Sequence, residues 1–214
     1  MATKINKKIL TLSISLTLFL FVQFYPIIET AIAATATDNV IVTLDVTTGI
    51  TISDGANVTM APNIGVASDS SIGSSSWIVR TNAVNGYTLA VKASSSPALV
   101  SGPNSFADYT ETVLGTPEVW SVGVVAKEFG YSAYGTDTTT ATWGTAASCG
   151  AAGIPAALQK YVGFQISDKT IATRATVTPT SGVTTTICFA AAQNTIYAPS
   201  GTYTATITAT ATTL

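Results

Sequence analysis

The sequence predicts an all-β protein, an immunoglobulin-like antiparallel β-sandwich that follows a cleaved N-terminal signal helix. From residue 34 onward, short apolar stretches alternate with polar residues at strand spacing. Clusters of Gly, Pro, Asn and Ser separate these stretches and are typical of turns. Thr and Ser are abundant throughout, and they suit solvent-facing strand positions better than helix interiors.

The first 33 residues have the pattern of a secretory signal peptide. A basic start, an apolar stretch and small residues follow one another in the order Lys4, Lys7 and Lys8, then residues 9–24, then Ala31-Ile32-Ala33. We expect cleavage between Ala33 and Ala34, and therefore an extracellular or cell-surface protein. A retained membrane anchor is the alternative, although the apolar stretch is short for crossing a bilayer. The expected domains are a signal peptide over 1–33 and a single β-sandwich over 34–214.

Period-two alternation predicts the strands of this domain. The first covers residues 40–46, where Val40, Val42, Leu44 and Val46 alternate with Ile41, Thr43 and Asp45. Strands at 77–80 and 87–92 are expected to pair as a hairpin, because Asn85-Gly86 accepts the positive φ angles of a tight turn. Further strands are expected over 50–52, 120–126, 161–166, 171–178, 185–191 and 203–212.

Residues 97–160 are less regular than the rest, and we expect them to form an insertion between the core strands. Residues 151–160 are the one segment with a helical prediction. That helix would begin near Pro155, a residue tolerated in a first turn.

The charge of the chain is low and slightly acidic. Removal of residues 1–33 leaves six basic and ten acidic residues, a net charge of −4. Nucleic acids and anionic membranes are held by clustered Lys and Arg, so we expect neither nucleic acid nor membrane as a partner after signal cleavage.

The two cysteines, Cys149 and Cys188, are expected to form a disulfide in an oxidising compartment. Free thiols and a catalytic or metal-binding pair are the alternatives. The chain contains no His to accompany such a pair. On the loop-entropy model the bond would stabilise the fold by roughly 3–4 kcal/mol.

Absence of His also removes the Ser-His-Asp and Cys-His arrangements of hydrolases. Ser167-Asp168-Lys169 falls between two predicted strands and is interpreted as a turn. The carboxylates are scattered, although two from distant strands could still meet in a glycosidase cleft. We therefore expect a non-enzymatic protein without catalytic residues, cofactors or metal ligands.

Aromatic residues are the candidate ligand contacts. Tyr131, Tyr134 and Trp143 lie among Gly and Thr, and could form a sugar- or protein-binding patch. Trp77 and Trp120 open apolar alternating stretches and are expected in the core. Asn57 begins an Asn-x-Thr glycosylation sequon, which a polar turn explains equally well.

Two segments resemble secreted bacterial surface proteins. Gly86-Tyr87-Thr88-Leu89 is similar to the Gly-Trp-Thr-Leu strand of the WxL family, with Tyr in place of Trp. The stretch from Pro199 to Ile207 resembles the last strand of many such proteins, and that of spore coat protein U and related pilin subunits. WxL proteins bind non-covalently to Gram-positive cell walls, and coat protein U relatives assemble through strand exchange. The chain has no Trp-x-Leu, so no wall-binding residue is carried over.

Together these features predict a secreted, non-enzymatic structural or adhesive protein of the cell surface, able to assemble through edge strands. Its expected partners are cell-wall polymers, other surface proteins or further copies of itself. A cell-wall or carbohydrate-binding module is the alternative, and a secreted hydrolase is a third.

Overall fold

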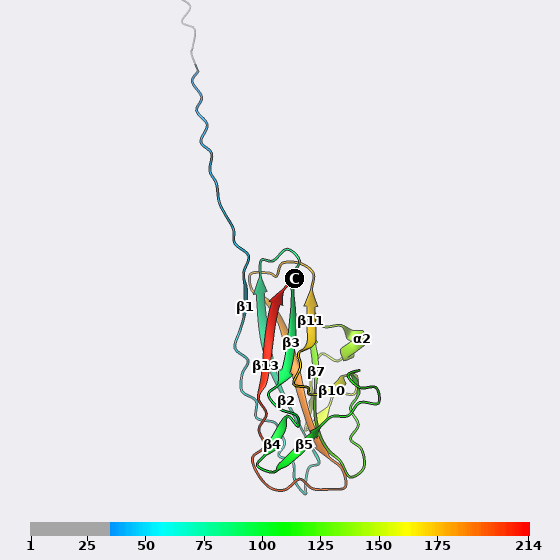
Figure 1. Ribbon diagram of the computed structural model, residues 1–214. Coiled ribbons are helices and arrows are strands. Elements are labelled where there is room, and N and C mark those ends of the chain that lie inside the picture. Colours follow the sequence, from blue (N-terminus) through cyan, green and yellow to red (C-terminus); the bar gives the residue numbers. More distant parts are fainter. Residues whose placement is uncertain (1–34) are drawn as a thin grey trace, which may run out of the picture. The chain divides into compact units, whose positions relative to one another are not determined.

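The computed structural model describes residues 35–214 (Figure 1). The chain divides into two units, residues 1–45 and 46–214. Described residues 35–45 of the first unit contain no helix or strand and are exposed. The second unit is built almost wholly from strands, so the all-β prediction is confirmed. The predicted signal helix and the cleavage site at Ala33 and Ala34 lie outside the described residues.

The second unit contains thirteen strands and one short helix. The strands are β1 (Ile50–Ile52), β2 (Ser70–Thr81), β3 (Tyr87–Ala93), β4 (Leu99–Ser101), β5 (Asn104–Asp108), β6 (Glu118–Val119), β7 (Lys127–Gly135), β8 (Gly150–Ala151), β9 (Ile154–Pro155), β10 (Lys160–Gly163), β11 (Lys169–Arg174), β12 (Val183–Gln193) and β13 (Ile207–Thr213). The helix, α2, spans Thr140–Trp143.

The larger sheet has the strand order β1-β2-β12-β7-β10-β6, with β4 and β5 joined to it at β7. Its centre is β12, which pairs antiparallel with β2 from Val183↔Val79 to Ala192↔Ser70. On its other side β12 pairs with β7 from Thr185 to Gln193. All pairings along that order are antiparallel; β5 and β7 form a short parallel pair.

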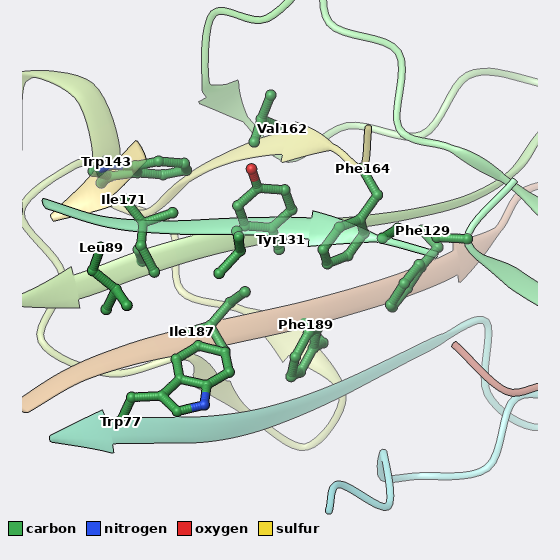
Figure 2. Packing of buried hydrophobic residues seen from close by; sticks show 14 of the residues in the cluster. Trp77, Leu89, Phe129, Tyr131, Trp143, Val162, Phe164, Ile171, Ile187 and Phe189 are labelled. Carbon is green, nitrogen blue, oxygen red and sulfur yellow. The ribbon is translucent and has the colours of Figure 1, made fainter. Parts of the chain in front are cut away.

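The smaller sheet has the order β11-β3-β13 and forms the second layer of the sandwich. Alternation sets its inner face, because β3 buries Tyr87, Leu89 and Val91 while the residues between them are partly exposed. These side chains meet those of β12 and β7 in one apolar core (Figure 2). The predicted antiparallel β-sandwich is therefore present.

The opposite face of the larger sheet is also covered. Tyr109, Tyr161, Cys188 and Ala190 form a second buried cluster there, with Trp120 packed against it. Loops from the middle of the chain supply this cover, so β12 is buried on both faces from Thr185 to Gln193.

Two predictions about the central segment were wrong. The expected insertion over 97–160 instead supplies β7, a central strand of the larger sheet. The helix expected over 151–160 is absent. A tight turn at Ala152 and Gly153, both at positive φ, joins β8 to β9 in its place. Gly153 favours such a turn, and an Ala-rich composition alone does not overcome it.

The predicted hairpin around Asn85-Gly86 was also wrong. A turn is present, since the Gly86 N–H donates to the Ala83 carbonyl at 3.0 Å and Gly86 has φ +79°. However, β2 and β3 lie in different sheets. β2 pairs with β1 on one side and with β12 on the other, so β3 cannot pair with it. The turn instead carries the chain across to the smaller sheet.

Two predicted strands are not strands in the structure. Residues 120–126 form a partly exposed loop. The Asn194 side-chain amide holds it by donating to the Val122 carbonyl at 3.0 Å. Residues 40–46 form no strand and have no strand partner in the described part of the chain. Alternation marks a segment suited to pairing, but a strand also needs a neighbour to supply its hydrogen bonds.

Candidate interaction site

Two of the three aromatic residues predicted to contact a ligand lie in the core. Tyr131 is 1% exposed and Trp143 is 2% exposed. Their ring centroids are 5.7 Å apart, and Tyr131 also packs on Phe164 at 4.3 Å (Figure 2). Burial raises the pKa of the Tyr131 hydroxyl above its ordinary value. The predicted surface patch was wrong, because α2 folds Trp143 back over the sheet.

The third residue, Tyr134, is half-buried and packs beside the second cluster. Cys149 and Cys188 meet in this region and form the predicted disulfide, with their Cα atoms 5.2 Å apart. The bond joins the loop layer to β12, at the middle of the larger sheet. Tyr134 thus belongs to the packing around the disulfide.

Two carboxylates that the sequence did not single out are buried. Glu111 accepts hydrogen bonds from the backbone N–H groups of Gly163 and of Gly115. Glu128 accepts one from the Thr110 N–H at 3.3 Å. Burial raises the pKa of the Glu128 carboxyl, and the nearby charge of Glu111 adds to this. Both groups bind loop backbone to the sheet. Among residues 35–214, no three His, Cys, Asp or Glu side chains gather as metal ligands.

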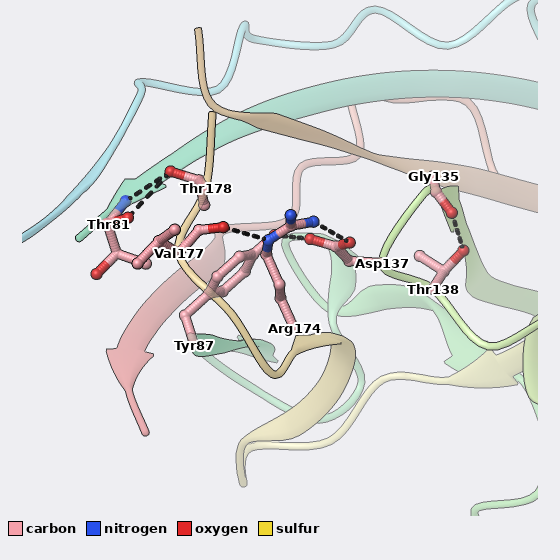
Figure 3. Close-up of polar contacts among 8 residues, drawn as sticks. All are labelled: Thr81, Tyr87, Gly135, Asp137, Thr138, Arg174, Val177 and Thr178. Carbon is pink, nitrogen blue, oxygen red and sulfur yellow. Dashed lines mark hydrogen bonds and ion pairs between the residues drawn. The ribbon is translucent and has the colours of Figure 1, made fainter. Parts of the chain in front are cut away.

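A second polar network ties the two sheets together (Figure 3). Asp137, in the loop between β7 and α2, accepts a hydrogen bond from the Tyr87 hydroxyl at 2.8 Å and pairs with Arg174 at 3.2 Å. Arg174 also donates from Nε to the Val177 carbonyl at 3.0 Å. Burial raises the pKa of Tyr87, and its hydrogen bond to Asp137 adds to the shift. No sequence signal linked these residues, which lie far apart along the chain.

The most regular unpaired feature of the sandwich is one edge of β13. Antiparallel residues alternate between those that bond to the neighbouring strand and those whose backbone groups point away from it. Thr206 accepts from the Ser94 N–H at 3.0 Å, and Leu214 donates to the Gly86 carbonyl at 3.1 Å. The even-numbered residues therefore bond to β3. The backbone groups that face away belong to Ile207, Ala209, Ala211 and Thr213.

Nothing in the described part of the chain pairs with this edge along Ile207–Thr213. The strand also lacks the usual edge protection, since it contains no charged residue, no Pro and no bulge. Its inner side chains are only half-buried, although Ile207, Ala209 and Ala211 pack against the core. The core is thus only partly covered beside β13, where the nearby β1 contributes Ile50.

The other sheet edges are short or covered. The β1 edge is three residues long and the β6 edge is two. The β11 edge is bulged between Thr170 and Ala172. Beside it, the Thr173 N–H donates to the Asp137 carbonyl at 2.9 Å. We therefore define the unpaired side of β13, residues 207–213, as the free edge.

The described N-terminal residues supply a second exposed apolar feature. Aliphatic side chains at residues 40–46 are 76–90% exposed, and apart from Ile41 they occur at every second residue of the sequence. We call residues 40–46 the N-terminal segment. Its only charged residue is Asp45. Exposed apolar stretches of this kind are typical of interaction sites.

Comparison of the chain with protein-family models, curated proteins and solved structures gives no match. The resemblance to the WxL family therefore stays a prediction. Within residues 35–214, no helix has both the length and the apolar character needed to cross a membrane.

Proposed function

We propose that this chain is a secreted structural or adhesive protein of the cell surface, without enzymatic activity. The signal-peptide pattern supports export, and the Cys149–Cys188 disulfide suits an oxidising environment. A surface rich in Thr and Ser and poor in charge suits a protein that must stay folded outside the cell without a cofactor.

The observation that carries the proposal is the free edge of β13 together with the N-terminal segment. Soluble sandwiches protect their edges against association. Here a seven-residue edge carries only Ile, Thr and Ala, and the same chain exposes an alternating apolar stretch. Both features favour contact with other protein chains over chemistry on a small molecule.

The competing functions have less support. The carbohydrate-binding alternative relied on surface aromatics, and Tyr131 and Trp143 are buried. A hydrolase would use paired carboxylates, and the buried pair Glu111 and Glu128 is engaged with backbone N–H groups.

The location can be tested in the cells that make the protein. An epitope inserted between Val113 and Leu114, which are 63% and 83% exposed, would leave the strands intact. We expect antibody to label intact cells, and protease added outside them to remove the label. We also expect cells without the gene to lose attachment to surfaces or to each other. Label that appears only after lysis would contradict the proposal, and so would unchanged attachment.

A further inference from the structure

We infer that the N-terminal segment of one copy adds as a strand to the free edge of another copy. The inference deepens the proposed function by naming the partner, a second copy of this chain, and the two surfaces that meet. Strand addition supplies main-chain hydrogen bonds along an open edge, and alternate side chains of the added strand fill the space beside the core.

The two segments match in length and pattern. The N-terminal segment and β13 each have seven residues, and the segment has no strand partner in the described part of the chain. Val40, Val42, Leu44 and Val46 lie on one face of the segment. The inner side chains of β13 are those of its odd-numbered residues, and the unpaired backbone groups belong to the same residues. An added strand could therefore bond to this edge and turn its apolar face inward.

Side-chain size also fits. The middle of the free edge has Ala209 and Ala211 on its inner face, and both are only half-buried. Val42 and Leu44 are larger, and both are more than four-fifths exposed. Large side chains beside small ones complete a packed layer, as interdigitation in protein cores requires.

The direction of the added strand follows from where the segment is attached. The Asn82 side chain donates to the Thr47 carbonyl at 2.8 Å and accepts from the Gly49 N–H at 2.7 Å. Asn82 follows the last residue of β2, and the neighbouring Gly86 accepts from Leu214, which follows β13. Residue 47 and the C-terminal end of β13 are thus at the same end of the sandwich.

In a head-to-tail row of copies, the segment then enters the next copy at the start of β13. It runs antiparallel to that strand and pairs Val46 with Ile207, Leu44 with Ala209 and Val42 with Ala211. The outer face brings Asp45 opposite Thr208, whose partner across the ladder is Lys92. Lys92 is the basic residue of β3, and it already pairs with Asp168 of its own copy at 3.8 Å. Because each copy offers one segment and one edge, the contact is heterologous and can propagate.

The experiment uses exported chain carrying variants on one side of the contact or the other. The segment variant combines Val42→Asp with Leu44→Asp, and keeps an intact free edge. The edge variant is Ala209→Pro, which removes an outward N–H and leaves the bonds from β13 to β3 intact. Thr43→Asp, on the outer face of the segment, is the matched control.

Analytical ultracentrifugation gives the masses. We expect parent and Thr43→Asp chains to form species of at least twice the monomer mass, and each variant alone to be monomeric. An equimolar mixture of the two variants should form a heterodimer, since one contributes the segment and the other the edge. A monomeric parent chain at every concentration, or a mixture that remains monomeric, would overturn the inference.

A cross-link gives an independent readout if Ala209→Pro fails to fold. Thr43 and Thr210 are opposite one another in the proposed register, on the outer face. Mixed Thr43→Cys and Thr210→Cys chains should join through a disulfide, and Thr43→Cys mixed with Val84→Cys should not. Equal yields from both mixtures would refute the register and the contact. Monomers found on the cell surface would contradict this inference alone. Assembled chains found only inside cells would contradict the proposed function alone.

Discussion

Reduction of the Cys149–Cys188 disulfide should destabilise the sandwich without changing its architecture. The bond closes a loop with a sequence separation of 39 residues. On the loop-entropy model, opening such a loop lowers the free energy of unfolding by about 4 kcal/mol at 25 °C. Packing adds little to this figure, because reduction removes no heavy atom from the cluster of Tyr161, Cys188 and Ala190.

Urea unfolding followed by tryptophan fluorescence measures this difference. The segment variant described above should be used, so that assembly does not add to the stability. Oxidised and reduced chains are compared. The Cys149→Ala, Cys188→Ala double variant should lose more stability than reduction does, because it also removes the buried sulfur of Cys188. A difference below about 1 kcal/mol would refute the reasoning, since the loop then constrains the unfolded chain little.

Three further substitutions test the buried contacts, and a fourth, Lys92→Ala, is an exposed comparison. Trp143→Ala should cost about 3–5 kcal/mol in urea unfolding, because it empties a core position, whereas a surface ligand contact would leave stability unchanged. Asp137→Asn should cost about 2–3 kcal/mol through loss of its charged hydrogen bonds, while Lys92→Ala, from an exposed pair, should cost less than about 1 kcal/mol. Glu128→Gln should raise stability at pH 7 and have no such effect below pH 4, as unfolding curves at both pH values would show. Burial raises the pKa of Glu128 above its ordinary value, so its favourable contribution is present at low pH and is lost as pH rises through the folded-state pKa.

Sequence alone predicted the strands whose two faces differ. Residues of β13 alternate Ala with Thr, and the structure exposes the Thr face and half-buries the other. Similar alternation placed β3, and the cysteine pair predicted the disulfide. The alternation is a local feature of the sequence. The disulfide could be predicted because the chain has only two cysteines.

The sequence did not predict strands that are buried on both faces, or single residues that are buried by distant parts of the chain. In β7, every residue from Glu128 to Ala133 is buried, so its sequence shows no period of two. Trp143 lies between Thr and Gly, a composition typical of loops, yet it covers the core. Buried Glu111 depends on the backbone of Gly163, which is far away in the sequence. Contacts of this kind follow from the tertiary fold and leave no periodic signal.

Amide hydrogen exchange at β13 is the most direct measurement of the central claim, that the free edge is completed by another copy. In the monomeric segment variant, the N–H groups of Ala209 and Ala211 should exchange fast while those of Thr208 and Thr210 are protected. In the parent chain, all four should be protected, together with residues 40–46. Protection of Ala209 and Ala211 in the monomer would contradict the account, as would their rapid exchange in an assembled parent chain.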